Sequence, residues 1–287
     1  MNSNENNLRQ AKLFLLPTPI GNLGDISLRT LETLQSVDAI YCEDTRNTLK
    51  LLNYYEIRKP VYSCHEHNEE QKAAEIAGHV MNGKSIAFVS DAGMPAVSDP
   101  GERLIRYFIR NDLPFEVFPG ANAALMAWVM SGFSTKKLFF CGFLPRSGAE
   151  RTEAIEELRR QSAVCVVYES PMRVGATLAE LYQRLGNRPC AVVRELTKLH
   201  EEAVRGNLLG LSEKYAQTPP KGECVIVIGP AENNVADNAD TEKLKNVLKQ
   251  LLSAGVRAKD AAKIASYALN SSKNEAYRVA IELGEEY

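Results

Sequence analysis

Three runs of small residues carry the groups best suited to bind a ligand. Each run follows a short apolar stretch and is rich in Gly, Pro and small polar residues, at positions 17–25, 90–101 and 119–124. Small residues let a ligand approach the backbone closely. The first two runs also hold three aspartates, Asp25, Asp91 and Asp99. Carboxylates at such a site favour a neutral or positively charged cofactor over a polyphosphate.

Signatures of several other chemistries are missing from the sequence. It contains no G-x-x-x-x-G-K-[ST], which argues against a nucleoside triphosphatase, and no G-x-G-x-x-G, which argues against a classical dinucleotide site. It also lacks the G-x-S-x-G nucleophile elbow. His65 and His67 flank Glu66, but no third metal ligand is evident, so a surface loop is favoured and no metal is expected.

The composition indicates a globular protein whose basic character is local rather than global. The formal net charge of -2 argues against a chain that is basic overall, so any phosphate contact must come from a local patch. The six cysteines include no C-x-x-C pair, which is typical of reduced thiols. Residues 1–10 lack an apolar signal core, and no stretch approaches the about 20 apolar residues that cross a bilayer. We therefore expect a cytoplasmic protein without membrane contact.

Alternating strands and helices must position the three runs of small residues. Apolar stretches at 13–16, 85–89 and 115–118 are expected to be strands that end at these runs, with helical patterns between them. Such alternation predicts a mostly parallel sheet with helices on both faces, whose ligands bind at the carboxyl ends of the strands. A helix capped by Ser27 is expected to bury one face, made of Leu28, Leu31 and Leu34.

The order of the elements predicts three parts. A first α/β domain is expected at residues 11–132 and a second at 133–231, where strands and helices alternate again. A polar linker is expected at 231–239, followed by a small helical domain at 240–287 with a break at 269–272 between two helices. The predicted fold class is therefore α/β with a C-terminal helical appendage.

The amino-acid sequence of the loops resembles that of the tetrapyrrole methylase superfamily. The first loop reads L-L-P-T-P-I-G-N-L-G-D-I-S at 15–27, and six further segments match the same family. They are E-D-T-R at 43–46, S-D-A-G-M-P at 90–95, S-D-P-G at 98–101, P-G-A-N-A at 119–123, Y-E-S-P at 168–171 and R-E-L-T-K at 194–198. The resemblance covers residues 13 to about 230, and the combination of motifs is more specific than any single one. Within the superfamily, the loops are most similar to those of members that methylate ribose in small-subunit ribosomal RNA.

This resemblance implies two α/β domains of tetrapyrrole-methylase type with S-adenosylmethionine in the cleft between them. It implies methyl transfer to the 2'-hydroxyl of a cytidine in the decoding centre of 16S rRNA, with the small ribosomal subunit as partner. It also implies a homodimer, because members of the superfamily commonly pair. The chain departs from the pattern at Pro19, which stands where many small-molecule relatives have a glycine of G-x-G-x-G-D. This departure argues against a porphyrin-like substrate.

The resemblance also points to residues that would hold the methyl donor. They lie in the first loop, the acidic loop, the P-G-x-x loop and the strand ends of the second domain. By position they are Pro19, Asp91, Ala92, Gly93, Met94, Ser98, Asn122, Ala123, Met172, Leu196 and Gly229.

Methyl transfer to a ribose hydroxyl needs in-line placement of the acceptor and a group that takes its proton. Polar segments at strand ends supply candidates for the catalytic role, namely Glu43, Asp44, Arg46, Glu195 and Lys198. The sequence does not say which of them is the base, and Arg46 and Lys198 could instead bind flanking phosphates. The alternative for 43–46 is a helix cap with surface ion pairs, which stabilise little.

A basic C-terminal segment offers a path for RNA. Between Lys243 and Arg278 the chain has eight Lys and Arg but only two acidic residues. Arg103, Arg106 and Arg110 at helical spacing could extend this path. The alternative for the C-terminal segment and for these arginines is a solvated charged face.

Two other functions stay open. One is a methylase of the same superfamily that acts on a tetrapyrrole-like small molecule or a protein side chain, and the other is a non-enzymatic nucleic-acid-binding protein.

Overall fold

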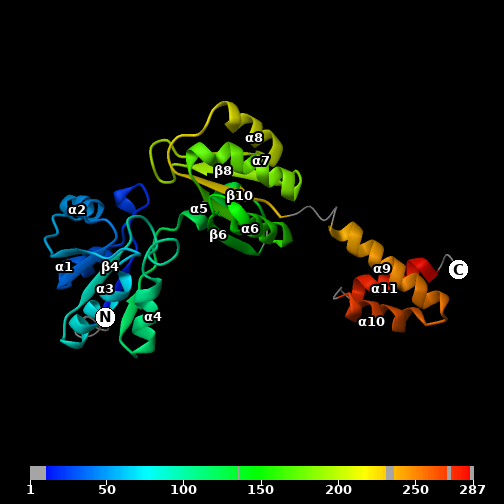
Figure 1. Cartoon of the computed structure of the whole chain (residues 1–287), viewed down its shortest axis with the longest axis horizontal. Coiled ribbons are helices and arrows are strands. Elements are labelled where there is room, and N and C mark those ends of the chain that lie inside the picture. The colour runs from blue at the N-terminus through cyan, green and yellow to red at the C-terminus, as the bar shows by residue number, and fades with distance from the viewer. Residues whose placement is uncertain (1–10, 135, 231–235, 270–272, 285–287) are drawn as a thin grey trace. The chain divides into compact units, whose positions relative to one another are not determined.

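The computed structural model describes residues 11–134, 136–230, 236–269 and 273–284 (Figure 1). Contacts divide the chain into two compact units, residues 1–230 and residues 231–287. The first unit holds two five-stranded sheets, and the described helices of the second unit form a small bundle. The predicted α/β class with C-terminal helices is confirmed.

The first sheet is wholly parallel and has the strand order β3-β2-β4-β1-β5. Its strands are β1 (Leu13–Leu16), β2 (Ala39–Cys42), β3 (Val61–Ser63), β4 (Ile86–Val89) and β5 (Phe115–Val117). In the register of the sheet, Leu15 lies opposite Phe88 on one side and Val117 on the other. The three runs of small residues therefore leave three adjacent strands, β4, β1 and β5, at one edge of the sheet.

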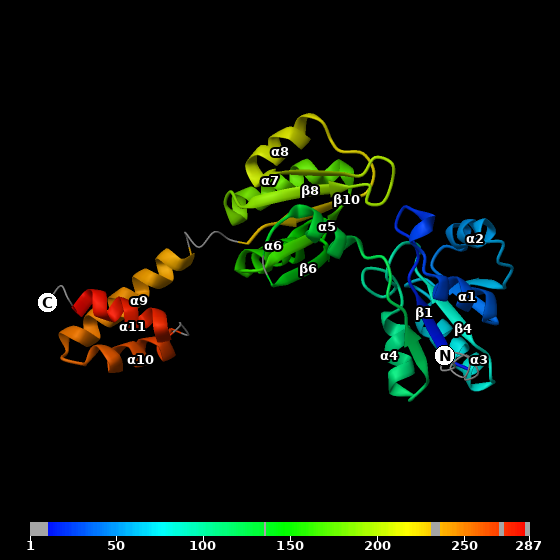
Figure 2. The same ribbon diagram turned by 180° about the vertical axis from the view of Figure 1, so that it is seen from behind.

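Helices cover both faces of the first sheet (Figures 1 and 2). On one face lie α1 (Leu28–Ser36) and α2 (Thr45–Tyr54), and on the other lie α3 (Glu69–Met81) and α4 (Glu102–Arg110). Every residue of β1, β2 and β4 is buried, as expected for parallel strands between two helical layers. The doubly covered parallel sheet predicted for this part of the chain is confirmed.

The predicted buried face of α1 is partly wrong. Ser27 accepts a hydrogen bond from the Thr30 N–H and caps the helix as expected. Leu34 is buried, but Leu28 is 77% exposed, and Thr30 and Thr33 are buried instead. A helix turns about 100° per residue, so each step of three residues falls about 60° short of a full turn. The spacing i, i+3, i+6 therefore drifts off the face that Leu34 occupies.

The second sheet is mixed and has the order β6-β7-β10-β8-β9. Its strands are β6 (Leu138–Phe143), β7 (Val164–Glu169), β8 (Pro189–Arg194), β9 (Glu202–Asn207) and β10 (Cys224–Ile228). Only β6 and β7 pair in parallel, whereas β10 runs antiparallel to both of its neighbours. On one face, apolar residues of the sheet pack against α6 (Gly148–Arg160), α7 (Val174–Leu185) and α8 (Leu208–Gln217).

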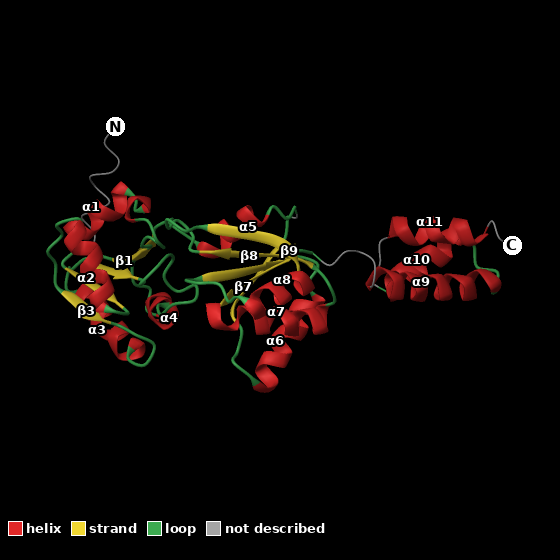
Figure 3. Cartoon of the chain, turned by 90° about the horizontal axis from the view of Figure 1, so that it is seen from above, coloured by secondary structure: helices red, strands yellow, loops and turns green. Residues whose placement is uncertain are grey.

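The opposite face of the second sheet is covered by α5 (Ala123–Ser131), as Figure 3 shows. Ala124 and Ala127 pack there against strand residues such as Val166 and Val193. This helix follows β5 of the first sheet in sequence, so it ties the two sheets together. A domain division between residues 132 and 133 stays a prediction, and α5 lies on its first side in sequence while it packs on the second sheet.

The second unit contains three described helices, α9 (Ala236–Ser253), α10 (Ala258–Ala268) and α11 (Lys273–Gly284). The prediction of two helices is wrong because the chain also turns at Gly255, which has a φ of 79°. The expected linker overlaps α9, which has already begun at Ala236, and the expected break at 269–272 falls mostly on residues 270–272, outside the described ones. Among the described helices, none combines the length and the apolar character that a membrane span requires.

Candidate active site

A cavity of about 250 Å³ lies where the loops of the first sheet meet the second sheet. The first sheet and the start of α5 contribute Ile20, Ala92, Gly93, Met94, Val97, Ser98, Asp99, Asn122 and Ala123. The second sheet contributes Phe143, Tyr168, Leu196, Glu223, Cys224 and Val225. The wall is therefore mostly apolar and small, with two carboxylates.

The strand directions explain how the second sheet reaches this cavity. Phe143 and Tyr168 stand at the carboxyl ends of the parallel strands β6 and β7. Because β10 is antiparallel, its first residue, Cys224, pairs with Glu169 and Arg194 at the same edge. The beginning of one strand and the ends of three others thus form one wall.

The acidic loop after β4 is fixed to the loop after β1. Thr18 and Gly93 exchange two backbone hydrogen bonds, of 3.0 and 2.9 Å. The Ser90 hydroxyl donates to the Gly93 carbonyl at 2.6 Å, and the Thr18 hydroxyl donates to the Ser90 carbonyl at 3.0 Å. Gly93 has a φ of 82°, and a Cβ there would approach Ile20 to 3.1 Å. A glycine therefore lets the backbone itself form the cavity wall.

A buried carboxylate holds the far end of the acidic loop. Glu69 on α3 is 3% exposed and accepts hydrogen bonds from the N–H groups of Gly101 (3.0 Å) and Leu104 (2.9 Å). These groups belong to the first turn of α4, whose own capping residue, Gly101, has no side chain to offer. Glu69 thus caps α4 from another helix and fixes the segment that carries Ser98 and Asp99.

Three carboxyl groups interact electrostatically near the cavity. Burial, with smaller contributions from Glu43 and Asp91, raises the pKa of Asp99 to about 6. Burial also raises the pKa of Glu43, and the charges of Asp91 and Asp44 add to that shift. Asp91 itself does not line the cavity, because its two oxygens accept from the Asp44 N–H (3.1 Å) and the Asn47 side-chain amide (2.9 Å).

The segment 43–46 forms a helix cap and a surface ion pair, the arrangement that the sequence analysis gave as the alternative to a catalytic role. The Asp44 carboxylate accepts from the Arg46 N–H at 2.9 Å and caps α2. The same carboxylate takes two side-chain nitrogens of Arg46, the closest at 2.7 Å. These hydrogen bonds lower the pKa of Asp44 to about 2. Glu43, Asp44 and Arg46 are absent from the cavity wall.

Glu195 and Lys198 belong to an ion-pair network beside the cavity. Glu195 accepts hydrogen bonds from the Glu223 N–H and from Lys198, both at 3.0 Å, and Lys198 also pairs with Glu223 at 2.8 Å. The Glu223 N–H and Lys198 together lower the pKa of Glu195. A Cβ on Gly21 would lie 2.5 Å from Lys198 Cγ, so this network packs directly against the first loop. It joins the two sheets beside the cavity.

The structure brings together most, but not all, of the residues expected to bind the donor. Seven of them line the cavity: Ala92, Gly93, Met94, Ser98, Asn122, Ala123 and Leu196. Pro19 and Asp91 are neighbours of lining residues without lining the cavity themselves. Met172 is 77% exposed, and Gly229 follows the end of β10 that lies away from the cavity. The antiparallel direction of β10 is the reason that Gly229 is remote.

Sequence analysis did not assign several of the residues that line the cavity. Some follow a rule that could have found them, and others follow no such rule. Phe143 and Tyr168 end parallel strands, so the rule that placed the loops of the first sheet would have found them. Glu223, Cys224 and Val225 begin an antiparallel strand, for which no such rule applies. Asp99 lies in a matched motif, yet the sequence cannot show that its side chain faces the cavity while that of Asp91 does not.

No metal site emerges from the described part of the chain, where no three His, Cys, Asp or Glu side chains gather. The rings of His65 and His67 face each other edge to face, with centroids 6.0 Å apart. The described cysteines are free, and burial raises the pKa of each, which suits the inert core thiols expected from the sequence.

Comparison with known proteins gives the family. Residues 12–211 match the profile of the family described as Tetrapyrrole (Corrin/Porphyrin) Methylases. The chain belongs to this family. A relative from Bacillus subtilis (strain 168), named ribosomal RNA small subunit methyltransferase I, is 40% identical over 269 residues, covering 92% of each chain. A second relative of the same name, from Mesorhizobium japonicum, is 39% identical over 273 residues, covering 94% of this chain and 92% of its own.

Solved structures of tetrapyrrole methylases share the fold. The cobalt precorrin-4 methyltransferase CbiF covers 80% of this chain and 98% of its own, with a TM-score of 0.60 and 17% identity. A uroporphyrin-III C-methyltransferase from Thermus thermophilus, complexed with S-adenosyl homocysteine, covers 76% and 97%, with a TM-score of 0.54 and 18% identity. The α/β fold of tetrapyrrole-methylase type is thereby confirmed.

Proposed function

We propose that this chain transfers the methyl group of S-adenosylmethionine to small-subunit ribosomal RNA, at the 2'-oxygen of a cytidine ribose in the decoding centre. The observation that carries the RNA substrate is the 40% identity to the Bacillus subtilis relative over 92% of both chains. The structural neighbours act on other substrates by name, but at 14 to 18% identity they speak for the fold only. A ribosomal substrate would place the chain in the cytoplasm.

The residues of the cavity fit the proposed donor. S-adenosylmethionine, when bound, supplies a methyl group on a positively charged sulfur. Ile20, Leu196 and Val225 offer apolar wall for its nucleoside, and the exposed backbone at Gly93 allows close approach. Asp99 and Glu223 place negative charge at the wall, which favours a cation.

The chain's own contribution to transfer is mainly placement. The acidic loop is fixed at one end by Thr18 and at the other by Glu69, so its lining residues are held before any ligand arrives. Preorganised placement of an acceptor beside a reacting carbon lowers the barrier without covalent chemistry by the protein. Asp91 and Pro19 serve the proposed donor site through this loop pair, and Met172 and Gly229 are its least supported members.

The predicted catalytic candidates divide into two groups. Glu195 and Lys198 act as positioning residues, because their hydrogen bonds tie the end of β8 to the start of β10, and Lys198 packs against Gly21 of the first loop. Glu43, Asp44 and Arg46 stand at the start of α2, and Arg46 is already paired with Asp44. Contacts of Arg46 or Lys198 with RNA phosphates would have to share or replace these pairs.

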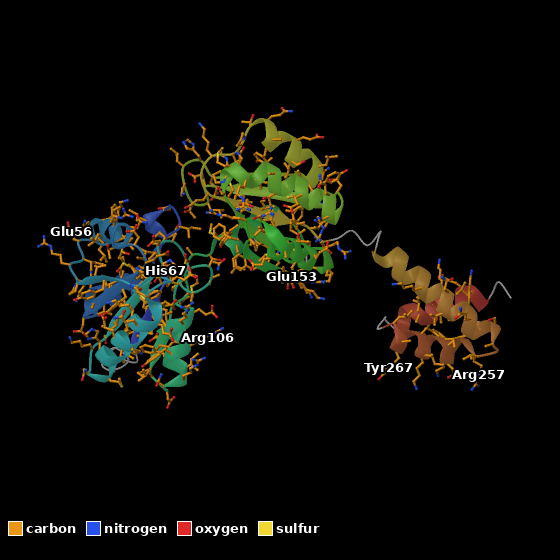
Figure 4. The ribbon with its side chains drawn as sticks, in the orientation of Figure 1. Glu56, His67, Arg106, Glu153, Arg257 and Tyr267 are labelled. Carbon is orange, nitrogen blue, oxygen red and sulfur yellow. The ribbon has the colours of Figure 1, made fainter. Side chains whose placement is uncertain are left out.

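The C-terminal helical unit supplies a proposed RNA surface. Lys259, Lys263 and Tyr267 lie at four-residue spacing along α10, so they form one ridge, and all three are exposed. Tyr267 is 92% exposed and projects from the unit together with Arg257 (Figure 4). Arg257 also pairs with Asp260, and Arg106 pairs with Glu102 on α4. Basic side chains beside an exposed ring suit a single-stranded or looped nucleic acid.

The experiment that tests the function uses the full chain with donor labelled in its methyl group. Undermethylated small subunits and naked 16S rRNA are offered separately, and digested products are examined for label on the ribose of a cytidine. Label on that ribose is the expected result. Label on a base, or only on a protein or a tetrapyrrole, would contradict the proposal. Donor binding without any transfer would favour a different acceptor, and no donor binding would favour a non-enzymatic binding protein.

The predicted homodimer is a separate proposal. Sedimentation of the full chain at micromolar concentration is expected to give twice the chain mass of 31.8 kDa.

A further inference from the structure

One of the two carboxylates in the cavity wall has no partner in the described part of the protein. Glu223, the other acid in its wall, is paired with Lys198 at 2.8 Å. Asp99 lines the same cavity, and among the described residues no group donates a hydrogen bond to it or forms an ion pair with it. Asp99 is partly buried, and its oxygens are not among the enclosed polar atoms that lack a partner. The carboxylate is therefore open to the cavity and available to accept a hydrogen bond or a proton from a ligand.

The loop that carries Asp99 is hydrogen-bonded at both of its ends. Glu69 fixes the N–H groups of Gly101 and Leu104, just beyond Asp99. On the near side, the Gly93 carbonyl accepts from the Ser90 hydroxyl and from the Thr18 N–H. The Asp99 carboxylate is thus presented on a braced segment.

Two aromatic rings stand on the wall that the second sheet contributes to the cavity. The ring of Tyr168 packs edge to face with Phe143, with centroids 5.4 Å apart, and Phe143 is 63% exposed. An exposed ring at the mouth of a cavity can stack a nucleobase that has been turned out of RNA. A nucleotide held there would bring its ribose to the mouth of the cavity that Asp99 lines.

We propose that Asp99 is the general base of the methyl transfer, taking the proton of the ribose 2'-hydroxyl. This inference rests on the proposed function and adds the residue that the sequence left unassigned. As the proton passes to the carboxylate, the oxygen forms its bond to the methyl carbon, and the sulfur departs with the electrons of the broken carbon–sulfur bond. Asp99 then returns the proton to water, so the carboxylate is restored.

The surroundings of Asp99 suit this role. Glu43 and Asp91 face it with like charge, and Tyr168 and Glu223 share the cavity wall. Burial, with smaller contributions from these like charges, raises the pKa of Asp99 to about 6. A carboxyl group with that pKa is ionised at neutral pH, yet it is a stronger base than an ordinary aspartate.

The test compares three variants with the parent chain across pH 5 to about 9. Asp99→Asn keeps the shape of the side chain but removes the base. Asp99→Glu keeps a base but moves it. Asp112→Asn is the matched control, because Asp112 is exposed, remote from the cavity and at a φ of 51°, which Asn tolerates well. Donor affinity is measured by calorimetry, and carboxyl titration is followed by carbon NMR of labelled aspartate.

Three results would support the inference together. The methylation rate of the parent chain rises with pH. The midpoint of this rise matches the pKa of the aspartate NMR signal that is absent from Asp99→Asn. The Asn variant is slower by about 10² to 10⁴ and lacks this rise, while its donor affinity changes less than about tenfold. Asp99→Glu retains a rise with pH at a reduced rate, and the Asp112 control behaves as the parent.

Other results would contradict the assignment of Asp99 as the base. An Asn variant within about threefold of the parent, or one that keeps the rise with pH, rules out Asp99 as the base. A rate loss explained entirely by weaker donor binding rules it out as well. If the parent chain methylates no RNA ribose at any pH, the proposed function fails and this inference fails with it, whereas the former outcomes leave the proposed function standing.

Discussion

The position of Asp99 should make the fold less stable at neutral pH. An aspartate in an unfolded chain has a pKa of about 3.9, whereas that of Asp99 in the folded protein is raised to about 6. Between these values the folded state binds the proton more readily than the unfolded state does. Stability therefore falls as pH rises through this window, and the loss persists above it.

Asp99→Asn is accordingly expected to stabilise the protein at pH 7.5, by about 1–2 kcal/mol once the remaining solvent exposure of the group is allowed for. At pH 4 the gain should vanish, because the parent carboxyl is then protonated in the folded state. Urea unfolding at both pH values measures the difference, with Asp112→Asn as the control. A gain that is equal at both pH values would show that ionisation of Asp99 is not its source.

At the scale of single residues, the sequence could predict the loop but not the side chain. Asp91 and Asp99 stand in the same loop with similar neighbours. Their surroundings differ, because Asp91 accepts from the Asp44 N–H and the Asn47 amide, whereas Asp99 meets no such donor among the described residues. Contacts between loops far apart in sequence decide such a case, and no local pattern encodes them. Glu43, Asp44 and Arg46 illustrate the same point, because a family motif there coincides with an ordinary helix cap.

At the scale of elements, the acidic loop depends on a cap supplied by a different helix. Glu69→Ala is expected to destabilise the fold by about 1–3 kcal/mol, because two buried N–H groups lose their acceptor. It should also weaken donor binding, since the same bonds fix the segment that carries Ser98 and Asp99. Urea unfolding and calorimetry measure the two effects.

Two further variants separate the cap from general effects on α3. Glu69→Gln keeps one acceptor oxygen and should fall between the parent and Glu69→Ala. Glu70→Ala removes the neighbouring exposed carboxylate and should change neither property. If Glu70→Ala destabilises the protein as much as Glu69→Ala does, the cap is not the reason.

The elements themselves were predictable to different degrees. Apolar runs that end in small residues gave β1, β4 and β5 to within one residue or so. For β1 and β4 the reason is that parallel strands buried on both faces must be apolar throughout, whereas β5 is a less buried edge strand that contains Glu116. β9 was not predicted, since it is an edge strand with the largely polar sequence Glu202–Asn207. The antiparallel direction of β10 was also beyond reach, because strand direction is set by the whole sheet. That direction explains both the missed Glu223 and the misplaced Gly229.

At the scale of the whole molecule, the two units differ in charge. The chain as a whole carries a formal charge of -2, yet residues 243–278 hold eight basic and two acidic residues. The proposed donor cavity lies entirely within the first unit, and α9 begins at Ala236, after the last described residue of that unit. Cofactor binding and RNA binding are therefore expected to be separable.

Truncation tests this separation, and the structure decides where to cut. A chain that ends at residue 239 would retain the first residues of α9, so the chain should end at Pro230. We expect the truncated chain to bind S-adenosylmethionine within about threefold of the full chain and to methylate small subunits at least tenfold more slowly, because it lacks basic contacts that contribute to RNA affinity.

Charge reversal in the full chain tests the same idea without removing the fold. Lys259→Glu combined with Lys263→Glu should slow RNA methylation and make it less sensitive to salt, because fewer counterions are then released on binding. Lys84→Glu combined with Lys136→Glu changes the net charge equally at exposed positions of the first unit and should have a smaller effect. If both pairs reduce the rate alike, the overall charge governs RNA binding. If neither does, the ridge on α10 is not the RNA surface, and a slow truncated chain would then point to another face of the helical unit.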